Sequence, residues 1–256
     1  MTNNILFSLS HSNQVATITL NKPTTYNAFD LDMLIKLNQH ITTASHDDNV
    51  KLIIINANGK HFSTGADLNW MQHSINYDID ANLDDANHLA SMLLNLYHLT
   101  KPIICSIQGN AYGGAIGIIA CADVVIAANN ANFCFSEVKL GLAPAIISQF
   151  VLKSMNNNFA TYHMLTAKPF NAEQALNAGL VDELVPLNHL QKSITNNIEQ
   201  LLSLNIESIM TTKQLLKLQL NPISLEKLNI CIQAIAKLRT SPVSQELIKQ
   251  FLKSKK

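Results

Sequence analysis

The residue with the clearest potential for proton-transfer chemistry is a single acid, Glu137, in the segment 132–141, NFCFSEVKLG. Its neighbours along the chain are mostly apolar and include Phe135 and Val138. Such surroundings would partly remove the carboxyl group from water and raise its pKa toward the range useful for acid and base catalysis. A glutamate exposed at the end of a strand is the alternative interpretation, and this segment alone does not decide between the two.

Two glycine-containing turns each follow a short apolar run that is typical of a buried strand. The first turn, residues 61–68 (HFSTGADL), follows the run 52–55, and the second, residues 108–115 (QGNAYGGA), follows the run 103–107. A small residue after glycine at the start of a helix leaves its backbone N–H free near the positive helix end. Two such N–H groups facing one another would form an oxyanion hole. The alternatives are an ordinary capped loop at the first turn and, at the second, glycines that only permit close helix packing.

The composition argues against several other classes of function. The chain has 256 residues, 47% of them hydrophobic and 14% charged, which is typical of a globular protein. Lysine plus arginine (18) balances aspartate plus glutamate (18), and Arg239 is the one arginine, so we expect no nucleic-acid partner. The four cysteines and nine histidines lack any paired ligand spacing, and we therefore expect neither a disulfide framework nor a metal site.

No segment has the pattern of a signal peptide or a membrane span. The first residues carry no basic region ahead of an apolar run. The longest apolar stretch, 111–128, contains Asp123 and a Gly-Gly pair near its start, and it is predicted to form a short helix followed by a strand at 124–127. Because the cysteines also suit a reducing compartment, we expect a cytoplasmic protein with no membrane partner.

Alternating strand-like and helix-like segments over the first 140 residues predict an α/β fold. The predicted strands are 5–9, 15–20, 52–55, 103–107 and 180–185; the predicted helices are one capped by Asp30, then 82–99, 187–202, 206–218, 225–238 and 245–253. The expected organisation is a core over residues 1–200 followed by a C-terminal helical region over residues 201–256. Residues 71–80 are polar, lack a clear period and are expected to be mobile.

Several motifs together resemble the enoyl-CoA hydratase/isomerase family, the crotonases. They are Asn21-Lys22-Pro23, Asn27-Ala28-Phe29, the FxxGADL segment at 62–68, Gly113-Gly114, Glu137 with Gly141 and Pro144, and AxxxGLV at 175–181. This resemblance implies a spiral of repeated β-β-α units with C-terminal helices that pack across subunits in a homotrimer or a pair of trimers. It also implies an acyl-CoA thioester as substrate, so that coenzyme A belongs to the substrate and no separate cofactor is expected.

The resemblance also implies a set of site residues. The backbone N–H groups of Ala66 and Gly114 would be the oxyanion-hole donors, and Glu137 the catalytic acid and base. The residues expected to contact the substrate or its coenzyme A portion are Lys22, Ala28, Thr64, Asp67, Leu68, Gly113, Gly117 and Lys139. The phosphates would have to be met by lysines and main chain, because one arginine is available.

One position departs from the family pattern. Many hydratases of this family carry a first glutamate in the helix after the Gly-Gly turn, and here that position is Gly117. With Glu137 alone, one carboxylate could take a proton from water and then return it to C2. The alternative is that it moves a proton between C2 and C4, which is isomerisation and needs no water.

A finer resemblance favours hydration. The strings at 65–72, 111–117, 135–142 and 144–148 are similar to the bacterial methylglutaconyl-CoA hydratase branch, which serves leucine and acyclic-isoprenoid breakdown and has glycine at the same place. If the acyl group ends in a second carboxylate, Lys139 could meet it, provided that it points the same way as Glu137, as alternate residues of a strand would. The alternative is a lysine that is simply solvated. We therefore expect a hydratase acting on a branched 2-enoyl-CoA, with an isomerase or a non-catalytic acyl-CoA-binding homologue as alternatives.

Overall fold

A six-stranded sheet forms the centre of the fold in the computed structural model, which describes residues 3–219 and 224–254. Its strands, in spatial order, are β1 (Ile5–Ser10), β2 (Val15–Leu20), β3 (Leu52–Ala57), β4 (Ile103–Ile107), β6 (Val124–Ala128) and β9 (Glu183–Val185). The first pair is antiparallel, and every other neighbouring pair is parallel. The predicted strands 5–9 and 15–20 are confirmed as the antiparallel pair β1 and β2, and the predicted strands 52–55 and 103–107 as β3 and β4.

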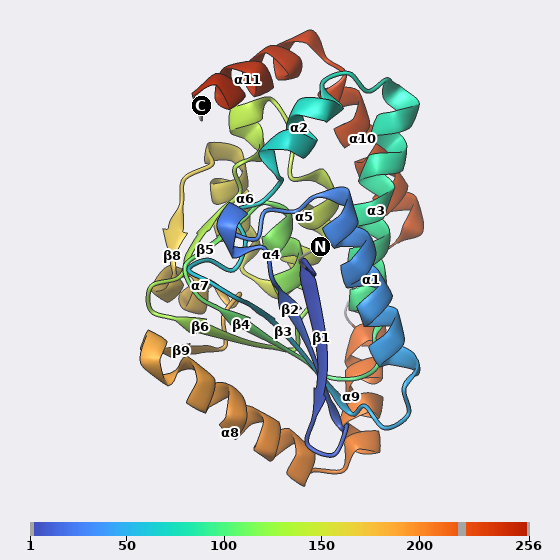
Figure 1. The fold of residues 1–256 in the computed structure, drawn as a ribbon, viewed down its shortest axis with the longest axis vertical. Coiled ribbons are helices and arrows are strands. Elements are labelled where there is room, and N and C mark those ends of the chain that lie inside the picture. Colours follow the sequence, from blue (N-terminus) through green and yellow to red (C-terminus); the bar gives the residue numbers. More distant parts are fainter. Residues whose placement is uncertain (1–2, 220–223, 255–256) are drawn as a thin grey trace.

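The strands in the middle of this sheet are covered on both faces, which explains their unbroken apolar runs. In β3, Ile53 and Ile55 belong to the main hydrophobic core, whereas Leu52 and Ile54 face a second cluster. That second cluster is closed by helix α8 (Leu190–Ser203), which lies across one face of the sheet (Figure 1).

The main core lies between the other face of the sheet and a layer of helices. These are α1 (Leu31–His46), α3 (Ile79–His98), α4 (Gly114–Ile119), α5 (Ala145–Ser154) and α10 (Leu225–Arg239). Helix α1 begins where the sequence predicted, because the Asp30 side chain accepts a hydrogen bond of 2.8 Å from the Met33 N–H.

A second, three-stranded sheet includes the beginning of the apolar stretch 111–128. It consists of β5 (Asn110–Tyr112), β7 (Asn132–Cys134) and β8 (Phe170–Asn171). The stretch therefore divides into β5, α4 and β6; the short helix and the strand after it were expected, whereas β5 was not. In the part of the chain that the structure describes, no helix is both long and apolar enough to cross a membrane.

The remaining helices are α2 (Leu68–Ser74), α6 (Asn157–Thr166), α7 (Ala172–Ala178), α9 (Ile206–Gln219) and α11 (Pro242–Lys253), with short 3₁₀ turns η1 (Pro23–Thr25), η2 (Glu137–Leu140) and η3 (Leu187–His189). The four predicted C-terminal helices are confirmed as α8 to α11. The predicted strand 180–185 is shorter than expected, because the left-handed Gly179 ends α7 and the Leu180 N–H still donates to the Ala175 carbonyl. The domain boundary at residue 200 and the mobility of residues 71–80 stay predictions.

Candidate active site

The two glycine turns lie side by side because they are joined by backbone pairing. Ser63 and Ala111 form a parallel β-bridge. The Ser63 N–H donates to the Asn110 carbonyl at 3.1 Å, and the Tyr112 N–H donates to the Ser63 carbonyl at 3.0 Å. The two predicted anion-binding turns therefore belong to one site.

The first turn presents the Ala66 N–H outward. Phe29 and Ala66 form a second parallel bridge, in which the Phe29 N–H donates to the Gly65 carbonyl (2.7 Å) and the Asp67 N–H donates to the Phe29 carbonyl (2.8 Å). This pairing uses the groups on either side of Ala66, and its own N–H has no protein acceptor among residues 3–219 and 224–254. Gly65 has a φ of +91°, a conformation that favours glycine.

The second turn presents the Gly114 N–H at the start of α4. Gly113, with a φ of +54°, precedes the helix and donates its own N–H to the Cys134 carbonyl at 3.0 Å. Gly114 is the first helical residue, so its N–H has no carbonyl within the helix to bond. No described group outside the helix accepts from it either, and both predicted donors are consequently available to a ligand.

Glu137 is half-buried and lies against this second turn, with one carboxyl oxygen, Oε2, out of water. A Cβ atom added at Gly113 would stand 3.3 Å from Glu137 Oε1, and Glu137 Oε2 is fully buried without a hydrogen-bond partner in the described chain. Burial raises the pKa of Glu137 from 4.5 to about 7, against a smaller lowering by its own backbone N–H. The alternative of a surface glutamate is therefore wrong, and the carboxyl group can both accept and donate a proton near neutral pH.

The position where a second acid would stand is filled by aliphatic side chains. A Cβ atom added at Gly117 would lie 2.7 Å from Ile147 Cγ2 and 2.9 Å from Leu93 Cδ1, closer than real Cβ contacts. At Gly114, by contrast, an added Cβ would make an ordinary contact of 3.6 Å with Leu89. Sequence reasoning did not single out these three aliphatic residues as part of the site.

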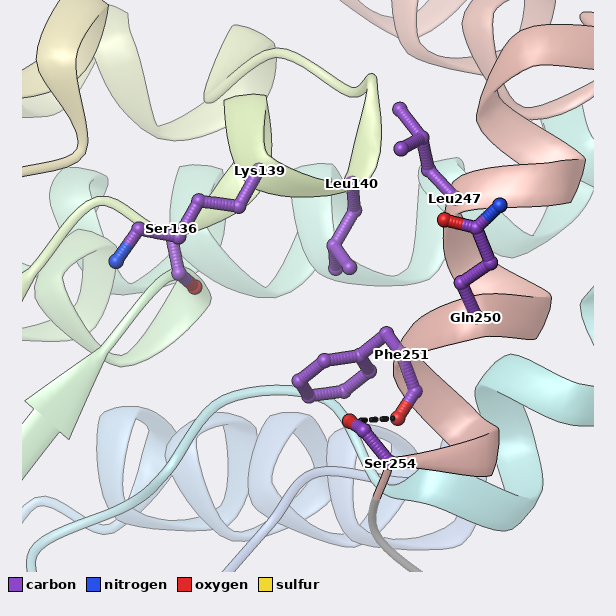
Figure 2. A pocket seen from close by; sticks show the side chains of 7 residues that line it. All are labelled: Ser136, Lys139, Leu140, Leu247, Gln250, Phe251 and Ser254. Atoms are coloured by element: carbon purple, nitrogen blue, oxygen red, sulfur yellow. Dashed lines mark hydrogen bonds between the residues drawn. The ribbon is translucent and has the colours of Figure 1, made fainter.

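Lys139 does not lie where strand alternation would place it. Residues 137–140 form the 3₁₀ turn η2, in which residues three apart share a face, so Lys139 stands with Ser136 rather than with Glu137. Figure 2 shows both residues bordering a pocket between η2 and α11, together with Leu140, Leu247, Gln250, Phe251 and Ser254. The Glu137 carboxyl group faces Gly113 instead, so the strand geometry on which the Lys139 assignment depended is absent.

The other predicted contact residues gather around the first turn. The Thr64 N–H donates to the Tyr26 carbonyl at 3.1 Å, which places Thr64 beside the segment that contains the buried Ala28. Leu68 is exposed at the start of α2. Lys22 and Asp67 form an ion pair, with Lys22 Nζ 3.0 Å from Asp67 Oδ2.

Two features bear on possible ligands. Arg239 forms an ion pair with the buried Asp85, whose other oxygen accepts from the Trp70 indole N–H at 2.9 Å. The guanidinium of Arg239 is thus already paired with a carboxylate within the described structure. Nowhere in residues 3–219 or 224–254 do three or more histidine, cysteine, aspartate or glutamate side chains group in a way that could hold a metal ion.

Replacing Gly117 by glutamate should destabilise the protein by about 3 kcal/mol, because the side chain would overlap Ile147 and bring a carboxyl group into an apolar wall. Urea unfolding would measure the loss. The double variant Gly117→Glu with Ile147→Ala should recover part of it, and Gly114→Ala, where the added carbon has room, serves as the matched control. Equal stability of Gly117→Glu and wild type would contradict the packing at this position.

The burial of Glu137 should also appear as a pH-dependent stability. Between about pH 4.5 and 7 the unfolded chain loses this proton while the folded chain keeps it, so the contribution of Glu137 to the unfolding free energy falls as pH rises. The variant Glu137→Gln should therefore gain stability over wild type across this window and hold a constant advantage above it. Urea unfolding at several pH values would test this, with the exposed Glu199→Gln as control; parallel curves for wild type and Glu137→Gln would refute it.

Known proteins resemble this chain in sequence and in fold. The chain matches the model of the enoyl-CoA hydratase/isomerase family over residues 10–256. A trans-2-decenoyl-acyl-carrier-protein isomerase from Streptococcus mutans is 33% identical over 205 residues, 79% of this chain and 78% of that protein. A 2,3-dehydroadipyl-CoA hydratase from Escherichia coli is 31% identical over 179 residues, 70% of this chain and 68% of that protein. The crystal structure of an enoyl-CoA hydratase from Shewanella pealeana has a TM-score of 0.82 at 35% identity, covering 98% of this chain and 94% of that chain. The chain therefore belongs to the enoyl-CoA hydratase/isomerase family and has the crotonase fold.

Proposed function

We propose that this protein is an enoyl-CoA hydratase that adds water across the 2,3 double bond with one catalytic acid. The observation that carries the proposal is Glu137, whose buried carboxyl group with a pKa of about 7 lies against the turn that presents the Gly114 N–H. At neutral pH both protonation states of such a group are populated, which suits a residue that must accept and then return a proton.

In this mechanism the thioester oxygen sits between the N–H groups of Ala66 and Gly114. The ionised Glu137 takes a proton from water while the water oxygen bonds to C3, and the electron pair of the double bond moves to form the enolate. The two N–H dipoles stabilise the charge on the enolate oxygen without reorganising. Glu137 then returns its proton to C2, so that the net change is the addition of one water molecule.

The proposal also covers the coenzyme A portion of the substrate and the association of subunits. The backbone near Ala28 and Thr64 contacts the coenzyme A portion, and coenzyme A enters as part of the substrate rather than as a separate cofactor. Exposed apolar side chains on α9 and α10, among them Leu216 and Ile230, support association into a trimer through the C-terminal helices.

Isomerisation is the second candidate, and the aliphatic wall at Gly117 favours it. Leu93 and Ile147 leave no room there for a second carboxylate to orient water. A single buried base can instead remove a proton from C2 of a 3-enoyl thioester and deliver it to C4. The similarity to the Streptococcus mutans isomerase supports the same possibility.

Two thioesters distinguish the reactions. Purified protein should lower the absorbance of the conjugated thioester when given 3-methylglutaconyl-CoA, because hydration removes the double bond, and should leave the absorbance of a 3-enoyl-CoA unchanged. The variant Glu137→Gln should lower kcat by at least about 100-fold in the active reaction, since it removes the group that transfers the proton. The exposed Glu199→Gln is the control.

A rise in absorbance with the 3-enoyl-CoA alone would replace hydration by isomerisation. If Glu137→Gln kept the wild-type rate with every acyl-CoA, the proposed role of Glu137 would be wrong, and a non-catalytic acyl-CoA-binding protein would be favoured.

We further propose that the preferred acyl group is branched and carries a second carboxylate, as in 3-methylglutaconyl-CoA. The apolar wall of Leu89, Leu93 and Ile147 supports a methyl branch. Because Lys139 does not share the face of Glu137, the variant Lys139→Ala should leave the ratio of kcat/KM for 3-methylglutaconyl-CoA to that for crotonyl-CoA unchanged. The exposed Lys192→Ala serves as control; a tenfold loss with 3-methylglutaconyl-CoA alone would return Lys139 to the acyl site.

A further inference from the structure

Lys22 joins the beginnings of two helices. Its Nζ lies 2.7 Å from Asp30 Oδ2 and 3.0 Å from Asp67 Oδ2. Asp30 caps α1 through its Oδ1, and Asp67 caps α2 by accepting from the Asn69 and Trp70 N–H groups through its Oδ1. Each carboxylate thus uses one oxygen for a helix and the other for the same ammonium group.

The two capped helices start directly beside the bridge that orients Ala66. Phe29 is the residue before Asp30, and Ala66 is the residue before Asp67. The hydrogen bonds between Phe29 and its neighbours Gly65 and Asp67 therefore lie between the two carboxylates that Lys22 holds. A shift of one helix start relative to the other would turn the Ala66 N–H.

The backbone of Lys22 is itself held in place. The backbone N–H of Lys22 donates to Asn27 Oδ1 at 2.8 Å, and the fully buried Asn27 side chain donates to the carbonyls of Asn58 and His61. Burial acts to lower the pKa of Lys22, but the hydrogen bonds to Asp30 and Asp67 outweigh it and hold the pKa above its usual value. Lys22 therefore stays charged between two carboxylates that would otherwise repel one another.

We propose that Lys22 is a positioning residue that fixes the Ala66 N–H in the oxyanion hole, rather than a ligand of coenzyme A as its motif suggested. The proposal rests on the proposed enolate chemistry. Lys22 acts through Asp30 and Asp67, and it touches neither the thioester nor the proton in transfer. Its loss lowers the stabilisation of the developing oxyanion and leaves substrate affinity largely unchanged.

The variants Lys22→Met and Asp67→Asn test this. The first removes the charge at similar length, and the second keeps an oxygen for the α2 cap but loses the ionic link. Each should lower kcat by about 10 to 100-fold, with KM and the Kd of free coenzyme A within about twofold of wild type. Lys22→Arg, which can still bridge both carboxylates, should recover most of kcat. The control is Lys36→Met, which breaks another lysine–aspartate pair on α1, with Asp32, at the surface.

The competing outcomes are distinct. A rise of tenfold or more in KM and in the Kd of coenzyme A, with kcat unchanged, would show that Lys22 binds coenzyme A. A lower melting temperature with unchanged kcat and KM in all variants would leave Lys22 with a purely structural role. Either result overturns the proposal.

A second readout separates this inference from the proposed function. The infrared carbonyl stretch of bound butyryl-CoA labelled with ¹³C at the thioester carbon reports polarisation by the oxyanion hole, and this saturated thioester does not react. The frequency of this stretch should fall when the thioester binds to wild type, and it should fall less when the thioester binds to Lys22→Met. Should wild type hydrate or isomerise no thioester, the proposed function fails, while the carbonyl shift still decides the role of Lys22; an identical shift in both proteins would refute it.

Discussion

The parallel pairing of β3 with β4 is the constraint on which the site depends. Ile53 pairs with Ile103 and Ile55 with Cys105, so the carboxyl ends of both strands reach the same edge of the sheet. The chain leaves each strand into a glycine turn, and the Ser63–Ala111 bridge carries the pairing from the strands into the turns. Because this contact is made by backbone groups, it fixes where the Ala66 and Gly114 N–H groups stand whatever acyl group the site receives.

The carboxyl group of Glu137 lacks the ionic partner that two buried charged groups elsewhere in the described structure have. The buried carboxylate of Asp85 is paired with Arg239, and the buried ammonium group of Lys213 with Asp123, so both charges are compensated within the described structure. Glu137 Oε2 is buried with no such partner, which is costly because desolvation disfavours the ionised form. An uncompensated carboxyl group is what a proton-transfer residue requires, since a salt bridge would hold its pKa low and remove it as an acid.

The apolar wall next to α4 gives the site its second property. Gly117 lets Ile147 and Leu93 approach the helix, and these side chains occupy the volume that a residue with a side chain would need. The described site thus combines two polar donors and one acid with a dry aliphatic surface. In such surroundings the fixed N–H dipoles act more strongly on developing charge than they would in water.

The sequence by itself determined the elements and the candidate groups. The unbroken apolar runs predicted β3 and β4, Asp30 predicted the start of α1, and the two glycine turns with Glu137 identified the chemistry-bearing segments, because each of these signals is local. It did not decide whether Glu137 is exposed, and it placed Lys22 with the coenzyme A contacts and Lys139 on a strand.

Tertiary structure decided the burial of Glu137, the partners of Lys22 and the orientation of Lys139. Glu137 is buried because η2 packs beside Gly113, the volume at Gly117 is taken by α3 and α5, and Lys22 meets Asp67 across 45 residues. Lys139 does not share a face with Glu137 because residues 137–140 form a 3₁₀ turn, which the sequence pattern did not predict. Local pattern sets which backbone forms; only packing sets which side chains lose water and which charges meet.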